Sequence, residues 1–95
     1  MARYIALLRF TSQGAKDLKH STKRAHQFDK TAKKAGVNIV GQYWTMGAYD
    51  GVLIIRADSE KKALHMLTEL AATGAVQTRT LQAFTDKEFD AIVRR

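Results

Sequence analysis

Two segments of the chain are apolar at nearly every position, and this feature constrains the fold more than any other. Residues 3–10 read RYIALLRF and residues 52–57 read VLIIRA. Each segment has the length of a β-strand, and a strand with one solvent-exposed face would alternate apolar and polar side chains. Near-continuous apolar sequence predicts instead that both faces of these two strands are covered.

Two further segments have the period of an amphipathic helix. Residues 15–35 place an apolar stripe at about 100° per residue with most of their lysines opposite it, and Gly36 is a typical residue just after a helix. Ser59 is a suitable cap for a second helix over residues 60–72. The expected buried stripes are Leu18, Ala25, Phe28, Ala32 and Ala35 in the first helix, and Ala63, Leu64, Leu67, Leu70 and Ala71 in the second.

Strands are also expected over residues 37–45 and 76–84. The glycine-rich turn over residues 46–51 joins the first of these to residues 52–57 as a hairpin. Residues 85–93 begin with the capping-box pattern TDKE and predict a short C-terminal helix. Simple alternation in the strand after the first helix would place Val37, Ile39 and Tyr43 on one face of the sheet, and Val40 and Trp44 on the other.

The resulting order is β-α-β-β-α-β followed by a short C-terminal helix. It predicts an α+β fold, a ferredoxin-like sandwich in which a four-stranded antiparallel sheet carries two helices on one face. With 95 residues, the chain has the size of one domain, spanning residues 1–95. Two helices cover only one face of the sheet, so we expect a second copy of the chain to cover the other, with a dimer as the default homo-oligomer.

Composition excludes several chemistries. The chain has no cysteine, which rules out disulfides, zinc–thiolate sites and a thiol nucleophile. His20, His26 and His65 do not have the spacing of metal ligands, so we expect no metal and no cofactor. No apolar run reaches the length of a membrane span or of a signal-peptide core, and we expect a small soluble, cytoplasmic protein without membrane association.

The net charge of +7 is concentrated in the first predicted helix, where residues 15–36 hold seven Lys or Arg and two Asp. A lysine stripe can follow a phosphate backbone, so nucleic-acid binding through this helix is one alternative. No aromatic side chains interleave with the stripe, and residues 3–10 offer Leu, Ala and Ile where an RNA-binding sheet would need exposed rings. The favoured interpretation is a solvated amphipathic helix, and nucleic-acid partners are not expected.

The turn between the two hairpin strands holds the candidate ligand-binding residues. Tyr49 and Asp50 could present a phenol and a carboxylate to a pocket, although an Asp before a Gly is also typical turn chemistry, which we favour. Trp44 could line an aromatic pocket, with core packing or subunit contact as the favoured alternative. No catalytic constellation is recognised. The candidate ligand-binding residues are Trp44, Gly47, Tyr49 and Asp50.

The run over residues 44–52, WTMGAYDGV, resembles the signature of the GYD domain family, which is named after this Gly, Tyr and Asp pattern. The similarity extends over essentially the whole chain, including the first strand with Tyr4 and Phe10 and the junctions at residues 36–37 and 56–59. The resemblance implies a dimeric α/β-barrel type of fold, similar in shape to small cofactor-independent monooxygenases, and it implies no established activity. The signature residues that carry over, without an assigned role, are Gly47, Tyr49 and Asp50.

These features together predict a self-associating module that binds a small molecule between the sheet and the helices, close to Trp44, Tyr49 and Asp50. A cofactor-independent monooxygenase or isomerase that uses the same pocket is the alternative. Such an enzyme would need a base within reach of its substrate, and the candidates are Asp50 or a histidine that points inward. Whether the protein is an enzyme stays open, and a non-enzymatic role is favoured.

Overall fold

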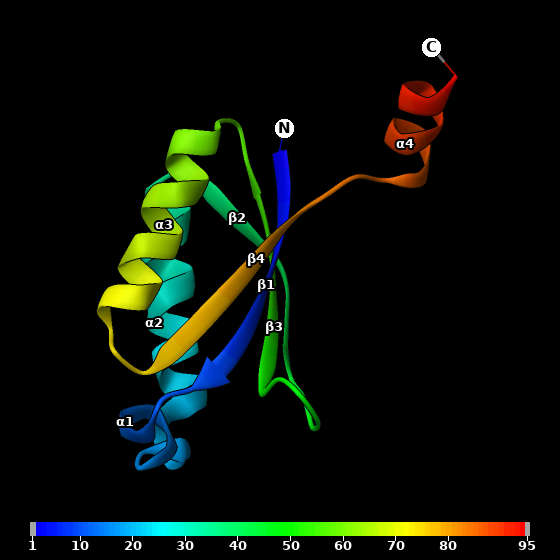
Figure 1. The fold of residues 1–95 in the computed structure, drawn as a ribbon. Helices are drawn as coiled ribbons and strands as arrows, with labels where there is room; N and C mark the ends of the chain where they lie inside the picture. The colour runs from blue at the N-terminus through cyan, green and yellow to red at the C-terminus, as the bar shows by residue number, and fades with distance from the viewer. Residues whose placement is uncertain (1, 95) are drawn as a thin grey trace.

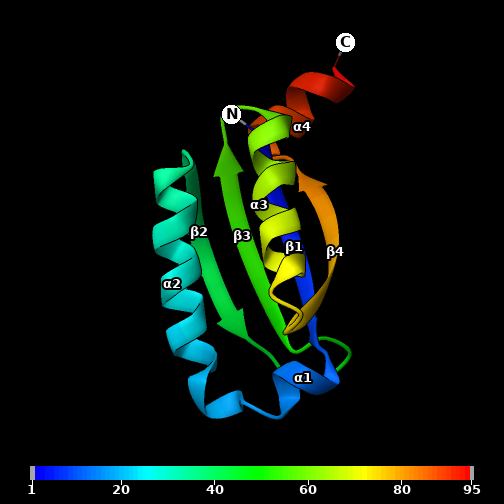
Figure 2. The same ribbon diagram turned by 90° about the vertical axis from the view of Figure 1, so that its left-hand side faces the viewer.

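The computed structural model describes residues 2–94 and confirms the ferredoxin-like α+β prediction. In chain order the elements are β1 (Ala2–Phe10), α1 (Ser12–Ala15), the short 3-10 helix η1 (Leu18–His20), α2 (Ser21–Lys34), β2 (Val37–Trp44), β3 (Gly51–Ala57), α3 (Glu60–Ala72), β4 (Val76–Ala83) and α4 (Asp86–Val93). The four strands form one antiparallel sheet in the order β2-β3-β1-β4. Figures 1 and 2 show α2 and α3 side by side on one face of this sheet.

The sheet and these two helices enclose a core that is rich in small side chains. β3 alternates buried and half-buried residues, so that Leu53 and Ile55 point toward the helices. In α3, Met66 is buried, whereas Leu64, which was expected in the buried stripe, is exposed. The buried core consists of Ala6, Ala32, Val37, Leu53, Ile55, Ala57, Ala63 and Met66.

The prediction of one helix over residues 15–35 is wrong over its first turns, because α2 begins only at Ser21. The residues before it form α1 and η1, separated by Asp17, whose backbone angles (φ −131°, ψ 48°) are not helical. Gly14 of α1 lies so close to the loop before β4 that a Cβ atom there would be 2.0 Å from the carbonyl oxygen of Ala75. The chain changes direction between α1 and α2, as Figure 2 shows. Leu18, which was expected in the buried stripe, lies in this segment and is exposed.

A β-bulge interrupts β2 and changes which side chains face the helices. The pairing with β3 passes from Ile39 opposite Ile55 to Gly41 opposite Ile54, so that Val40 is an extra residue. Such a bulge reverses the alternation of the residues that follow it. The predicted alternation is therefore wrong beyond Ile39. In the structure Gln42 and Trp44 share the helix-covered face with their partners Leu53 and Gly51, and Tyr43 lies on the opposite face with Val52.

The face of the sheet opposite α2 and α3 is uncovered in the part of the chain that the structure describes, and we call it the open face. It carries both apolar side chains and several arginines, and the Tyr43 side chain on it is 62% exposed. The register of the strands places on it Arg3, Ile5, Leu7, Arg9, Gly41, Tyr43, Val52, Ile54, Arg56, Gln77, Arg79, Leu81 and Ala83. Figure 1 shows α4 displaced from the body on the side of the open face, beyond the end of β4.

The surface of the chain is large for its mass. The accessible area is 6835 Å², whereas a compact monomer of 10.6 kDa exposes about 5,500 Å². The radius of gyration of 14.2 Å likewise exceeds the value of about 12 Å expected for a compact chain of this length. The uncovered open face and the projecting α4 both contribute to this large exposed surface.

Candidate functional site

A pocket of about 100 Å³ opens between the helix-covered face of the sheet and the ends of α2 and α3 nearest the β2–β3 turn. Its location is the one predicted from the sequence, between sheet and helices. Its apolar walls include Leu8, Phe10, Phe28, Leu53, Leu70 and Val76. Its polar lining residues are Ser21, Arg24, Gln42, Asp50 and Thr73.

Asp50 ties the turn after β2 to the neighbouring strand β1. Its carboxylate Oδ2 accepts a hydrogen bond from the backbone N–H of Phe10 at 2.8 Å, and its own N–H donates to the carbonyl of Leu8 at 2.8 Å. Its carbonyl accepts from the backbone N–H of Thr45 at 2.9 Å, which closes the turn. The last backbone pair between β1 and β3 is Leu8 with Gly51, and the Asp50 carboxylate adds one more hydrogen bond to β1 beyond it. It does not cap amides of its own turn, which is the turn chemistry favoured from the sequence. Within residues 2–94, its second oxygen, Oδ1, makes no hydrogen bond.

Tyr49 and Gly47 shape the turn and do not line the pocket. The guanidinium of Arg9 lies 5.3 Å from the centroid of the Tyr49 ring, and its Nε donates to the carbonyl of Ala48 at 2.9 Å. The Thr45 hydroxyl donates to the Tyr49 carbonyl at 2.7 Å. Gly47 has a φ of +110°, a conformation that strongly favours glycine. Of the four candidate ligand-binding residues, Trp44 and Asp50 thus line the pocket, and a ligand-binding role for any of the four stays a prediction.

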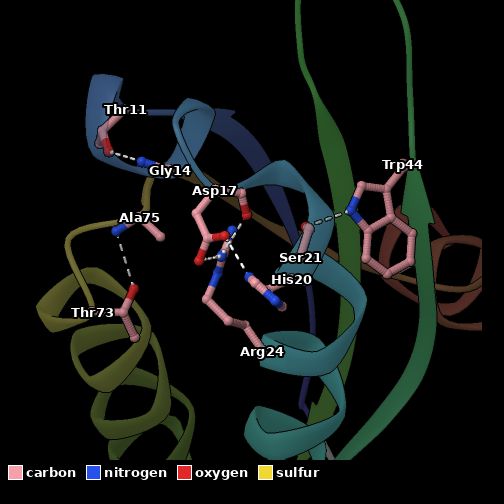
Figure 3. A network of polar contacts seen from close by, with 9 residues as sticks. All are labelled: Thr11, Gly14, Asp17, His20, Ser21, Arg24, Trp44, Thr73 and Ala75. Carbon is pink, nitrogen blue, oxygen red and sulfur yellow. Dashed lines mark hydrogen bonds and ion pairs between the residues drawn. The ribbon is translucent and has the colours of Figure 1, made fainter.

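Trp44 faces the helices because of the bulge, and it links β2 to the start of α2. Its indole Nε1 donates to the Ser21 hydroxyl at 2.9 Å, a contact visible in Figure 3. The ring remains partly exposed and forms the rim of the pocket. Trp44 and Tyr43 point to opposite faces, as the sequence requires of neighbouring strand residues.

Arg24 is held at the pocket by the segment that interrupts the predicted helix. Its Nη1 donates to the backbone carbonyl of Asp17 at 2.8 Å and to the Asp17 carboxylate at 3.1 Å. The same carboxylate pairs with the ring of His20, so Figure 3 shows one polar cluster around the entry to α2. Gln42 lies opposite Leu53 on the helix-covered face, and its side-chain amide makes no hydrogen bond to residues 2–94.

Sequence reasoning missed both Arg24 and Gln42. Arg24 was counted with the solvated basic face of the helix, and its position depends on Asp17, which lies in the non-helical segment. For Gln42 a usable signal was present, because the isolated Gly41 inside a strand pattern is typical of a bulge. Shifting the alternation at that glycine would have brought Gln42 and Trp44 to the pocket together.

No group of three or more His, Cys, Asp or Glu side chains within residues 2–94 could hold a metal ion. His20 and His65 pair with Asp17 and Glu69, respectively, on exposed helical surfaces. Across the same residues, no helix is long and apolar enough to cross a membrane.

The carboxyl group with the clearest electrostatic perturbation lies outside the pocket, on α4. Hydrogen bonds from the backbone N–H and the hydroxyl of Thr85 lower the pKa of Glu88, and the nearby Arg3 lowers it further. The Arg3 guanidinium lies 3.7 Å from Glu88 Oε1. This interaction stabilises the start of α4 and supplies no acid or base to the pocket.

Fold and pocket together define a small ferredoxin-like α+β domain with a small open pocket between its sheet and its helices. A family model of the GYD domain matches residues 4–93, and the chain belongs to the GYD domain family. A curated relative, the glutamine synthetase and cystathionine beta-lyase binding protein of Thermus thermophilus, is 31% identical over 84 residues, which cover 87% of this chain and 88% of the relative.

Solved structures of similar proteins support the same fold. The crystal structure of FFRP-DM1 superposes with a TM-score of 0.63 at 17% identity and covers 88% of this chain and 100% of its own. The crystal structure of a Thermus thermophilus protein gives a TM-score of 0.58 at 20% identity, covering 90% of this chain and 95% of its own. At these identities the likeness concerns the fold alone.

Proposed function

We propose that this chain is a non-enzymatic module that binds a small molecule in the pocket between the sheet and the two helices. The observation that supports the proposal is a set of three polar side chains with unused hydrogen-bonding capacity on otherwise apolar walls. Within residues 2–94, the Gln42 amide and Asp50 Oδ1 make no hydrogen bond, and Arg24 donates only through Nη1. Neither the Gln42 amide nor Asp50 Oδ1 is among the buried unpaired side-chain atoms of residues 2–94, so water can reach both in the open pocket, and a bound ligand would take the place of that water.

The pocket limits the size and chemistry of its occupant. Its volume of about 100 Å³ is well below the roughly 300–1,000 Å³ typical of sites for drug-sized ligands. A guanidinium, a carboxylate and an amide on the same lining favour a compact compound that carries both hydrogen-bond donors and acceptors. The rings of Phe10 and Phe28 add apolar contact for the remainder of such a compound.

A direct test is native mass spectrometry of the purified protein, followed by thermal-shift screening of polar compounds of amino-acid size. We expect a bound species or a stabilising compound for the parent protein. Gln42→Leu should abolish the stabilisation, because it removes the unpaired amide from the pocket. Gln82→Leu is the matched control, since Gln82 lies on β4 outside the pocket, and it should behave like the parent. The proposal fails if Gln42→Leu and the parent respond equally to every stabilising compound.

We also propose that the module is a homodimer formed through the open face. The accessible surface of 6835 Å² exceeds that of a compact monomer by roughly 1,300 Å², and a stable interface covers about 800 Å² per partner. Sedimentation velocity should show a dimer at micromolar concentration. Leu81→Glu, at an exposed position on the open face, should shift the protein to monomer, whereas Thr80→Glu on the opposite face of β4 should not. Equal sedimentation of both variants and the parent would exclude this interface.

Binding to other proteins is a second candidate function, favoured by the name of the 31% identical relative, a binding protein for glutamine synthetase and cystathionine beta-lyase. Its test is calorimetric titration of purified glutamine synthetase and of cystathionine beta-lyase, each from the same organism as this chain, with the parent protein. A cofactor-independent monooxygenase or isomerase remains the catalytic alternative. Its candidate base, Asp50, has one carboxylate oxygen engaged by the Phe10 amide, which favours a structural over a catalytic use.

A further inference from the structure

Within residues 2–94, the helix α4 has an apolar face that stays about half exposed. Phe89, Ile92 and Val93 are 61%, 50% and 58% exposed, respectively. Their spacing of three and four residues places all three on one side of the helix. Figure 1 shows α4 standing clear of the sheet and of both covering helices. A helix with this pattern normally buries its apolar stripe against a partner surface.

The length of α4 strengthens the argument. It has 8 residues, and isolated helices shorter than about 12–15 residues are marginal in water. A complete capping box starts it, in which the Thr85 hydroxyl accepts from Glu88 N at 3.2 Å and Glu88 Oε1 accepts from Thr85 N at 2.7 Å. The capping box therefore fixes where α4 begins, although a helix of this length gains little stability alone. Burial of its apolar face against another surface would supply the missing stability.

The acidic residues of α4 can offset the basic charge that two open faces would bring together in a dimer. The open face carries Arg3, Arg9, Arg56 and Arg79 and no acidic residue, so two open faces that meet would bring like charges together. α4 carries the acidic residues Asp86, Glu88 and Asp90 and one basic residue, Lys87, and Asp90 pairs with Arg94 at 2.8 Å. One of the acidic residues already lies beside an arginine of its own open face, at the 3.7 Å pair between Glu88 and Arg3. The projecting helix can therefore supply negative charge at the rim of an otherwise basic interface.

We infer that α4 of each copy packs its Phe89, Ile92 and Val93 face against the other copy, and so acts as a clasp that closes the homodimer. The inference rests on the proposed homodimer and adds a second contact to it. The helix lies on the open-face side of its own sheet, which is the side where the other copy would be. Packing there would bury the apolar stripe of α4 and part of the excess surface in one step.

Photo-crosslinking tests the contact directly. The chain has no cysteine, so Phe89→Cys provides a unique attachment point for a benzophenone maleimide on the apolar side of α4. Lys87→Cys, on the polar side of the same helix, is the matched control. In a mixture of ¹⁴N-labelled and ¹⁵N-labelled protein, we expect mixed-isotope crosslinks from residue 89 and few from residue 87. Crosslinks only within one isotope, or equal yields from both positions, would overturn the inference.

The strength of the dimer provides the second measurement. Sedimentation velocity over a concentration series should give a dissociation constant at least tenfold higher for the double variant Phe89→Ser, Ile92→Ser than for the parent, with Lys87→Ser unchanged. A far-UV spectrum that matches the parent outside α4 confirms that the body is folded. If the double variant dimerises like the parent while Leu81→Glu is monomeric, the clasp is wrong and the open-face dimer stands. If the parent is itself monomeric, both fail, while ligand binding in the pocket is judged separately by the Gln42→Leu test.

Discussion

Replacing Asp50 by alanine tests whether the aspartate of the GYD signature contributes mainly to the stability of the fold. The change removes the acceptor of the Phe10 N–H, a half-buried bond of 2.8 Å that joins the β2–β3 turn to β1. A buried or half-buried donor left without a partner costs about 1–3 kcal/mol. For a domain of this size, each kcal/mol corresponds to about 4–8 °C in Tm, so a loss of about 2 kcal/mol predicts a Tm lower by about 8–16 °C.

Asp50→Asn separates the contribution of geometry from that of charge. The asparagine side chain keeps an oxygen that can accept from the Phe10 N–H, and it loses the charge that strengthens this hydrogen bond. We expect it to lose roughly half as much stability as Asp50→Ala, about 1 kcal/mol. Asp58→Ala is the matched control, because Asp58 is an exposed carboxylate paired with Lys62 at 3.2 Å, and such surface pairs contribute at most about 1 kcal/mol.

Urea and thermal unfolding followed by circular dichroism measure all three variants at one fixed protein concentration, since self-association makes the apparent stability depend on concentration. The expected order of stability is Asp58→Ala, then Asp50→Asn, then Asp50→Ala. If Asp50→Ala unfolds together with Asp58→Ala, the reasoning is refuted. Asp50 would then be free for a role in the pocket, and loss of ligand stabilisation in both Asp50 variants would identify that role.

Three further predictions concern single residues. Gly14→Ala should destabilise by about 2–3 kcal/mol in urea unfolding, because its Cβ would lie 2.0 Å from the Ala75 carbonyl oxygen and the backbone must move. Gly47→Ala should cost only about 1–2 kcal/mol in the same assay, since its φ of +110° is unfavourable for alanine while nothing lies within 4 Å of the added atom; a loss larger than that of Gly14→Ala would contradict the ranking. The lowered pKa of Glu88 means that its contribution to α4 is fully present above the ordinary value of 4.5 and is lost as the pH falls through the lower folded value. The helical ¹³Cα shifts of residues 86–93 should therefore decrease on acidification below that range, and Glu88→Gln, which keeps an acceptor, should remove the pH dependence.

Local sequence patterns predicted the order of the four strands, the two covering helices and the C-terminal helix, and that both covering helices lie on one face of the sheet. The bounds of α3 were predicted correctly, because Ser59 caps it and its stripe has a clear period. The fold class followed from the same patterns, since apolar strands, helix periods and turn residues all indicate one topology. The resemblance of the turn to the GYD signature indicated the same topology, and the family match confirms it.

The parts that could not be predicted depend on contacts between distant segments. The non-helical segment at Asp17 is fixed by Arg24 and by the close approach of Gly14 to Ala75, which lies 61 positions further along the chain. No local pattern contains that approach. The structure has a pocket between the sheet and the helices, where one was predicted, and its role in ligand binding stays a prediction. Gln42 was missed because simple alternation fails at the bulge. Gly47 and Tyr49 were grouped with Asp50 by their proximity in the signature, whereas in the structure Asp50 both closes the turn and lines the pocket, and Gly47 and Tyr49 belong to the turn alone.

The bulge in β2 also determines where the strand tolerates a change of length. Val40 is the unpaired residue between the Ile39–Ile55 and Gly41–Ile54 pairs. Deleting it would leave an ordinary ladder in which every remaining pair, and so the facing of Tyr43 and Trp44, is preserved. Deleting Gln42 could also be absorbed by the bulge, with Val40 opposite Ile54 and Gly41 opposite Leu53, but glycine would then stand where the Gln42 amide lines the pocket. Among relatives, a strand one residue shorter around this site is therefore compatible with the same open face and with the same facing of Trp44, while only a deletion that spares Gln42 keeps its amide in the pocket.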